Sequence, residues 1–488
     1  MNRFKLLLTS LIQALFSKPG ETRLQRRIFL YSSFSLYVSG LWLWAQFFRY
    51  GNIVFRAGDW YKEYAFYSLI RESFVNGTIP YHTNLEFHGT HRFMALPEII
   101  FSPQILVLKF TDNIGLFVLI HVILLFTIGF IGCVALQRKF ELSTFSFTIL
   151  VSLFSFNGYI TSHLAVGHTM WGGYFFLPWL FLVMIAMTEE RRSDLKIALW
   201  LAMVLFLIWL QGSLHILVGC LIYLILFAVC NTKFIRVIGL SFCFASILSC
   251  FRLIPAIVSF RDHQQIFESG IPTVRDLVDG LTMIKYPTIE MIGGISGALF
   301  WWEMNFFIGV VGLLFVLYFG IYRYWKNEQL RAKLSGFTVP NIIIALLAMN
   351  YFYYLIARLP IPMASVERIP SRMMIIPLVF VILIACVLFD GMSRRQSRIG
   401  VFHLLALGGL VQTLLELMTH LRFWNVTSIN AVFPAGPVLK ILSVSVPNDQ
   451  FYVSAVRYSF LVSAVALIGW LILVWWPEPD SDSDSAEG

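Results

Sequence analysis

One short segment of this sequence carries acidic and basic side chains close together, in a pattern suited to acid–base chemistry. It runs Arg56-Ala57-Gly58-Asp59-Trp60-Tyr61-Lys62-Glu63. Gly58 permits a tight backbone approach, and on a helix Asp59 and Glu63, four residues apart, would share one face. Asp59 could then act on a ligand as a catalytic carboxylate, with Glu63 beside it. An aspartate at such a position also commonly caps a helix, so both interpretations are open here.

Three further polar residues follow along the chain. Glu98 lies in Leu96-Pro97-Glu98, where it could contact a substrate or simply begin a helix. His163 and His168 come after Asn157-Gly158-Tyr159 and could hydrogen-bond a substrate, or bind a metal together with Asp59. The two histidines are five residues apart, which is not the i,i+4 spacing of a helical metal pair. The sequence therefore identifies no metal site, although a divalent metal is left open.

A basic connection near the C-terminal third offers a different chemistry. It runs from Arg358 to Arg372 and contains Glu367-Arg368-Ile369-Pro370-Ser371-Arg372 beside several prolines. Because arginine binds phosphate oxygens in a bidentate manner, Arg368 and Arg372 could hold a phosphorylated lipid head group. The alternative is that Glu367 pairs with the arginines and that they only meet bilayer phosphates.

The composition shows what kind of fold must position these residues. Of the 488 residues, 58% are apolar and only 13% are charged, which is the composition of a membrane protein. The net charge of +9 is then explained by cytoplasmic anchoring, so no nucleic-acid partner is expected. The six cysteines all fall inside predicted spans, which excludes a disulfide scaffold.

Apolar segments long enough to cross a membrane recur along the whole chain. Short basic connections such as Arg138-Lys139 and Arg394-Arg395 all fall on one side, which favours an even number of spans with both ends in the cytoplasm. We predict an all-α polytopic membrane protein of about twelve spans, near residues 28–48, 113–136, 143–160, 170–188, 196–211, 214–231, 236–258, 304–323, 338–357, 373–391, 399–419 and 458–476.

The predicted spans divide the chain into a single membrane domain and two cytoplasmic ends. Residues 1–27 form a basic N-terminus, and residues 477–488 form an acidic tail that we expect to be disordered. The membrane domain covers residues 28–476. Its exoplasmic side carries surface helices and loops, which we place near 49–112, 259–303, 358–372 and 420–457. A helix from Asp59 to Phe74 is expected to lie along the membrane surface.

The motifs together resemble a known enzyme group. Gly58-Asp59 after the first span, Asn76-Gly77-Thr78-Ile79-Pro80, Phe101-Ser102-Pro103, Gly167-His168 and the Glu367–Arg372 motif have the order and spacing of the GT-C membrane glycosyltransferases, over roughly residues 50–390. The chain is most similar to the YfhO-like branch. The resemblance implies transfer of a sugar from a polyprenyl-phosphate donor to an exoplasmic acceptor, with Asp59 as the catalytic carboxylate. The paired acidic motif and large C-terminal domain of oligosaccharyltransferases are lacking, so neither a metal nor a protein acceptor is implied.

The chemistry of such a donor suits these residues. A polyprenyl-phosphate leaving group departs without protonation, so one carboxylate that accepts the proton of the acceptor hydroxyl can suffice. We therefore expect an inverting transfer with Asp59 as base and with Arg368 and Arg372 at the donor phosphate. The remaining candidates position the acceptor or the sugar: Glu63, Glu98, His163 and His168.

These expectations define the partners and the alternatives. The partners would be a polyprenyl-phosphate sugar, a glycan or lipid acceptor of the cell envelope, and membrane lipids. The enzyme would lie in the inner membrane of a bacterium, with its active site on the exoplasmic face. Two alternatives remain, a polymerase or ligase of O-antigen-type glycans, which joins lipid-linked chains, and a glycolipid transporter, which leaves its lipid chemically unchanged.

Overall fold

The structure is a computed structural model. It describes residues 2–87, 90–189, 193–260, 269–288, 300–357, 367–396, 399–432, 442–445 and 448–476. The predicted tail 477–488 lies outside the described residues, as do residues 358–366 of the connection that ends at Arg372.

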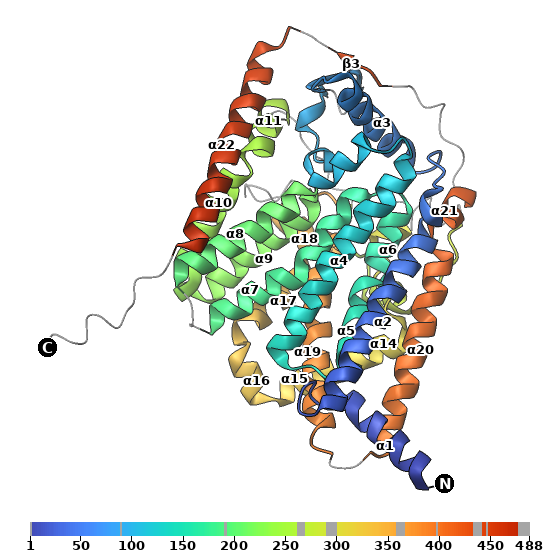
Figure 1. Cartoon of the computed structure of the whole chain (residues 1–488). Coiled ribbons are helices and arrows are strands. Elements are labelled where there is room, and N and C mark those ends of the chain that lie inside the picture. Colours follow the sequence, from blue (N-terminus) through green and yellow to red (C-terminus); the bar gives the residue numbers. More distant parts are fainter. Residues whose placement is uncertain are drawn as a thin grey trace, which may run out of the picture.

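The described chain is built almost entirely from helices (Figure 1). The α-helices are α1 (Asn2–Phe16), α2 (Arg23–Phe47), α3 (Trp60–Asn76), α4 (Ile114–Phe140), α5 (Thr144–Ser155), α6 (Gly158–Ala165), α7 (Leu177–Thr188), α8 (Asp194–Leu210), α9 (Leu214–Cys230), α10 (Ile235–Leu248), α11 (Cys250–Phe260), α12 (Val274–Thr282), α14 (Gly309–Phe315), α15 (Arg323–Lys326), α16 (Glu328–Lys333), α17 (Ser335–Leu347), α18 (Asn350–Ala357), α19 (Ile375–Ser393), α20 (Val401–Phe423), α21 (Val426–Val432) and α22 (Gln450–Trp475).

Shorter helical turns join several of these helices. They are η1 (Arg49–Gly51), η2 (Phe93–Ala95), η3 (Ile99–Phe101), η4 (Pro103–Lys109), η5 (Thr169–Phe176), η6 (Thr232–Phe234), η7 (Trp301–Glu303), the π-helical η8 (Val316–Tyr322) and η9 (Pro370–Met374). Some of them extend a neighbouring helix into one apolar segment, as η5 does for α7 and η9 for α19.

Several of these helices can cross a membrane, which confirms an all-α, multi-pass membrane protein. Seven segments of the described chain are long and apolar enough, or eight if the bent pair α10 and α11 is counted as one span. They are Arg23–Phe47, Ile114–Phe140, Thr144–Ala165, Thr169–Thr188, Pro370–Ser393, Val401–Phe423 and Gln450–Trp475.

The predicted number of about twelve spans is thus higher than the number of long apolar helices. The difference lies in segments whose helices are short or broken. The predicted spans at 196–211 and 214–231 form helices of 17 residues, α8 and α9. The predicted span at 304–323 is divided between α14, η8 and the start of α15, and α17 contains only 13 residues.

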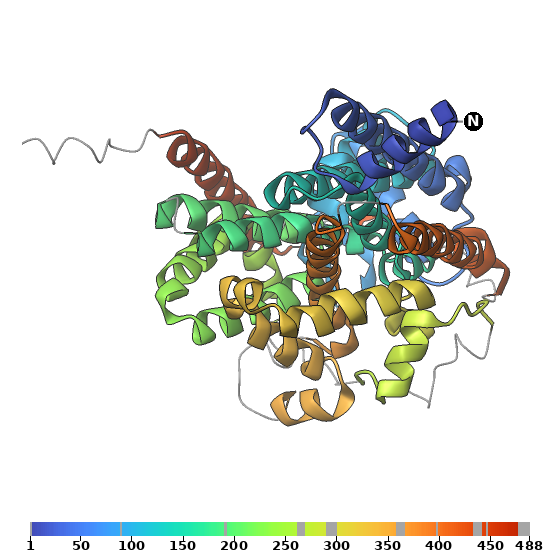
Figure 2. The ribbon, with the colours of Figure 1, turned by 90° about the horizontal axis from the view of Figure 1, so that it is seen from below.

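The spanning helices differ in how far the rest of the protein surrounds them. In the segment that contains α19, 89% of the residues in the apolar window are buried, against 17% for α20 and for α22. Figure 2 agrees, because α19 lies inside the bundle while α20 and α22 lie at its edge. The apolar residues of α20 and α22 are therefore available to lipid.

The two ends of the bundle carry different elements (Figure 1). Helix α3 and strand β3 (Val444–Ser445) lie at one end, and α1, α15 and α16 lie at the other. A small antiparallel sheet was not predicted. Its strands β1 (His82–Phe87), β2 (Thr90–Arg92) and β3 (Val444–Ser445) are ordered β2-β1-β3 and join the first long loop to the chain before α22. Arg92 reinforces the connection by donating to Asp449 at 2.9 Å.

At the opposite end, Asp390 of α19 anchors the beginning of α5. Its buried carboxylate accepts hydrogen bonds from the backbone N–H of Ser143 (2.6 Å) and from the hydroxyls of Ser143 (2.7 Å) and Ser146 (2.6 Å). Ser143 is the N-cap of α5, so the negative charge also faces a positive helix end.

We expect Asp390→Asn to destabilise the protein by about 1–3 kcal/mol, because the amide cannot accept all of these hydrogen bonds. Thermal unfolding in detergent measures the change. Asp112→Asn, at an exposed loop position, is the matched control and should melt like the wild type. Equal melting of the Asp390 variant and the control would contradict this role of Asp390.

Candidate functional site

The backbone before α3 fixes the position of Asp59. Gly58 adopts a φ of +58°, a conformation that favours glycine. The N–H of Asp59 donates to the carbonyl of Val166 at 3.0 Å, and the indole of the buried Trp60 donates to the carbonyl of Ala165 at 2.8 Å. Asp59 occupies the N-cap position of α3, but its side chain makes no capping hydrogen bond. The capping interpretation is therefore wrong, and the carboxylate is directed to other partners.

A buried lysine gathers three carboxylates around it. The Lys62 Nζ atom lies 2.9 Å from Glu98, 3.3 Å from Glu63 and 3.7 Å from Asp59. Burial alone would lower the pKa of Lys62, but the charges of Glu98, Glu63 and Asp59 raise it well above its usual value. Lys62 is therefore a permanent cation that ties the first turn of α3 to the segment that carries Glu98.

Glu63 and Glu98 are each held by further contacts. The fully buried Glu63 accepts hydrogen bonds from Tyr67 and from Thr169, the latter at 2.7 Å. Burial, assisted by the charge of Glu98, raises the pKa of Glu63. The backbone carbonyl of Glu98 accepts from the buried guanidinium of Arg252 at 2.8 Å. Both acids therefore occupy fixed positions around Lys62.

The two predicted histidines connect Asp59 to a second cluster. His168 Nε2 lies 3.3 Å from Asp59 Oδ2, and the Nδ1 atoms of His168 and His163 are 2.8 Å apart. His163 Nε2 in turn lies 3.8 Å from Glu303. Among the described residues, no group of three or more His, Cys, Asp or Glu side chains is arranged to hold a metal ion. The histidines thus form a hydrogen-bonded link that begins at Asp59.

The second cluster is centred on Arg372. Its guanidinium makes two parallel bonds to Glu303, at 2.7 and 2.6 Å, and lies 3.6 Å from Glu367. The Arg372 side chain is only 5% exposed and stacks over Trp171 at 4.9 Å. The pairing of Glu367 with an arginine is therefore present, and Arg372 is committed to buried acids. Arg368, the other predicted phosphate ligand, directly follows Glu367 and has an exposed side chain.

Glu367 also holds a histidine that the sequence did not single out as a site residue. His215 Nδ1 lies 2.7 Å from Glu367 Oε2, while Glu367 Oε1 accepts from the N–H of Ile369 at 2.9 Å. Burial alone would raise the pKa of Glu367, but His215 and Arg372 lower it. The pKa of Glu303 is lowered in the same way, mainly by Arg372.

The contacts described above thus join six of the seven predicted site residues into one connected polar network. We name this set of residues the polar network: Asp59, Lys62, Glu63, Glu98, His163, His168, His215, Glu303, Glu367 and Arg372. Most of its members are buried, but the Asp59 side chain is 44% exposed and that of His215 is 18% exposed. Ligands from outside can therefore reach the network at Asp59 and His215.

The surroundings of Asp59 keep it ionised. Burial would raise the pKa of Asp59, but the hydrogen bond with His168 and the positive charge of Lys62 hold it well below its usual range. The carboxylate is therefore able to accept a hydrogen bond at any physiological pH.

Gly167 is required for this arrangement, because a side chain there would collide with the start of α3. Its φ is +101°, and an added Cβ would lie 2.8 Å from the backbone nitrogen of Trp60. We expect Gly167→Ala to displace Asp59 and to lower the rate of the sugar transfer predicted from the sequence by up to about 10²-fold. Gly391→Ala, where an added Cβ meets nothing within 4 Å, is the matched control. Initial rates test this, and an unchanged rate in the Gly167 variant would refute it.

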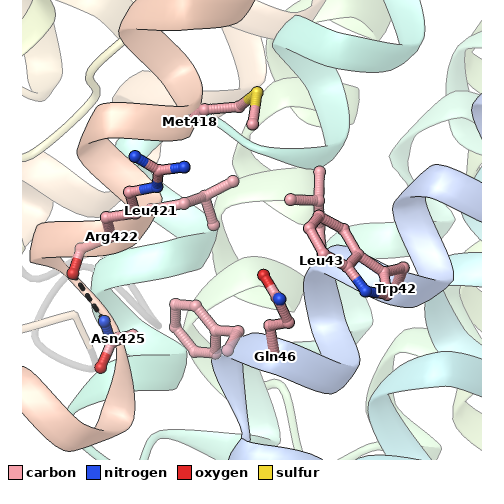
Figure 3. Close-up of a pocket in the computed structure, with 8 residues that line it drawn as sticks. Trp42, Leu43, Gln46, Met418, Leu421, Arg422 and Asn425 are labelled. Carbon is pink, nitrogen blue, oxygen red and sulfur yellow. Dashed lines mark hydrogen bonds between the residues drawn. The ribbon is translucent and has the colours of Figure 1, made fainter.

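A separate pocket lies between the ends of α2 and α20, and Figure 3 shows it. Trp42, Leu43 and Gln46 approach it from α2, and Leu421 and Arg422 from α20, with Asn425 following that helix. None of its lining residues belongs to the polar network.

Comparison with known proteins gives no relative. No family model, no curated protein and no solved structure matches the chain. The function must therefore be argued from the site itself.

Proposed function

We propose that this protein is a membrane glycosyltransferase that moves a sugar from a polyprenyl-phosphate donor to a hydroxyl group of a cell-envelope glycan or lipid. The observation that carries the proposal is the position of Asp59, a partly exposed and permanently ionised carboxylate at the end of a buried polar network. The resemblance to the YfhO-like branch of the GT-C enzymes supports it, because that resemblance assigns the catalytic role to the same residue.

The proposed reaction needs few protein groups. The acceptor hydroxyl attacks the anomeric carbon and gives its proton to Asp59, while the bond from that carbon to the phosphate oxygen breaks and its electron pair stays on the phosphate. Direct attack on one face inverts the anomeric centre. His168 contacts the carboxylate that takes the proton, at 3.3 Å, and Lys62 fixes the first turn of α3.

The acidity of Asp59 limits its role to transient proton transfer. A carboxylate with a lowered pKa is a weak base, so the proton must leave it as the transfer is completed. The His168–His163 pair offers a route, because the two rings are joined by a hydrogen bond of 2.8 Å. We also propose that the active site faces the exoplasm. The GT-C architecture of about twelve spans is part of the same proposal.

The experiment is donor consumption by the purified full-length protein in lipid nanodiscs. A panel of polyprenyl-phosphate sugars is offered with and without envelope glycolipids, and released polyprenyl phosphate is measured. We expect acceptor-dependent release from one class of donor. Absence of release from every donor and acceptor in the panel would count against the proposal.

A further inference from the structure

His215 forms a second carboxylate–imidazole pair at the site. Its Nδ1 lies 2.7 Å from Glu367, whose other oxygen is fixed by the backbone N–H of Ile369. An ionised Glu367 places the ring proton on Nδ1 and leaves Nε2 for another partner. None of the residues that the structure describes forms a hydrogen bond with Nε2. The Nε2 atom of this partly exposed ring is therefore available to a ligand.

Trp171 lies beside both His215 and the histidine that contacts Asp59. The ring of His215 lies 5.0 Å from Trp171, and the ring of His168, which contacts Asp59, lies 5.2 Å from the same indole. An inverting transfer needs its entering oxygen and its leaving phosphate on opposite sides of the sugar carbon. Both carboxylate–imidazole pairs lie beside the same indole, which allows Asp59 to meet the entering oxygen and His215 the leaving phosphate of one substrate.

The charges of the polar network favour a group that can become positively charged when a phosphate binds. The network contains five carboxylates, those of Asp59, Glu63, Glu98, Glu303 and Glu367, but only two permanent cations, Lys62 and Arg372. Arg372 is already engaged by two of the acids. Glu63, whose pKa is raised to about 7, is only partly charged near neutrality, but the two acids around Arg372 outnumber it, and a protonated imidazole offsets the repulsion that they exert on a phosphate.

The groups that face His215 come from several elements. Glu367 and Arg372 lie before and within η9, Glu303 ends η7, and His163 lies on α6. Burial of the ring is the largest effect and opposes its protonation, as do Arg372 and a protonated His163, whereas the two acids favour it. A bound phosphate adds negative charge and shifts this balance toward protonation.

We propose that His215 contacts the phosphate of the lipid-linked substrate and carries a proton while the phosphate is bound as a monoester. This inference rests on the proposed function. When the sugar–oxygen bond breaks, the phosphate changes from a singly charged diester to a monoester that can carry two charges. The proton on His215 comes from solvent, whereas the proton of the acceptor hydroxyl goes to Asp59. The exposed Arg368, which directly follows Glu367, is a second cation for the same phosphate.

The test measures binding of farnesyl phosphate to the full-length protein in nanodiscs of zwitterionic lipid. Calorimetry at about pH 8, where a free histidine is neutral, is repeated in buffers with different ionisation enthalpies to count protons. We expect uptake of close to one proton by the wild type. His215→Gln should bind roughly 10- to 100-fold more weakly and lose this uptake, because a charge-assisted hydrogen bond is gone.

Two further variants keep the test decisive. His403→Gln, at the opposite end of the bundle, should behave like the wild type. His215→Lys keeps a cation that does not titrate near neutrality, so it should retain binding without proton uptake, even if the glutamine variant folds poorly. Wild-type affinity and proton uptake in both His215 variants would overturn the inference and leave the proposed function standing. Absence of farnesyl phosphate binding in the wild type would overturn both.

Discussion

Replacing Asp59 with asparagine is expected to lower the rate of sugar transfer by about 10²–10⁴-fold, the usual contribution of a general base. Asparagine has nearly the same size, but its amide cannot take a proton from the acceptor hydroxyl. Because the side chain is 44% exposed, the loss of its contacts with His168 and Lys62 should change stability little. The measurement is kcat in nanodiscs, together with the KM for the donor. A fall in kcat with a nearly constant KM identifies a group that acts in the transition state.

Asp112→Asn controls for the loss of a negative charge in the same loop. Asp112 is exposed and should keep the wild-type rate when its carboxylate is removed. The pH profile gives a second check, because the pKa of Asp59 lies well below its usual range and the residue stays ionised in mild acid. Any loss of activity between about pH 7 and pH 5 must then come from other groups of the site, namely the histidines and Glu63, whose pKa burial raises to about 7. Full activity in the Asp59 variant would remove the proposed base.

Replacing Arg372 with methionine is expected to destabilise the protein by about 3–5 kcal/mol, the cost of breaking a buried ion pair. The change leaves Glu303 and Glu367 buried without their shared cation, at side-chain exposures of 2% and 0%. Thermal unfolding in detergent should show a large drop in melting temperature. Arg422→Met, at an exposed position of α20, should melt close to the wild type.

The origin of this loss can be tested with a second substitution and with pH. Adding Glu303→Gln to Arg372→Met removes one unpaired charge and should recover part of the stability. The pKa values of Glu303 and Glu367 are lowered in the folded protein, so their contribution is present above about pH 4, the value for a free glutamate, and is lost below it. The difference between wild type and variant should therefore shrink in acid. A constant difference would mean that Arg372 acts mainly through packing.

Much of the site could be found from residue type and local spacing. The i,i+4 relation placed Asp59 and Glu63 together, and both contact Lys62 in the structure. His163 and His168 were chosen as polar residues near a glycine-rich turn, and the turn at Gly167 does bring His168 to Asp59. These relations lie within short stretches of chain, where sequence distance limits the distance in space.

The residues that were missed are joined to the site only by tertiary packing. Glu303 lies 69 residues from its partner Arg372, and His215 lies 152 residues from Glu367. No local pattern predicts such pairs. Neither His215 nor Lys62 was assigned a role from the sequence, although Lys62 stands beside Glu63. The sequence offered one general signal. Charged residues are few in this chain, and a buried acid such as Glu367 requires a partner that can carry positive charge.

The number of spans shows a similar limit. Hydropathy located the long apolar helices well, since the predicted 113–136 and 399–419 overlap α4 and α20 over nearly their whole length. It could not show that the segment 304–323 changes to a π-helix within η8, or that α10 and α11 meet at an angle of 78°. Both features depend on how neighbouring helices pack rather than on apolar content.

The most direct test of the proposed function is the mass of the acceptor after incubation with wild-type protein and donor in proteoliposomes. We predict that the acceptor gains one sugar while polyprenyl phosphate is released in equal amount, and that Asp59→Asn abolishes both. Acceptors that grow by whole oligosaccharide chains would instead identify a polymerase or ligase. A lipid that crosses the membrane unchanged, with Asp59→Asn fully active, would contradict glycosyl transfer and identify a transporter.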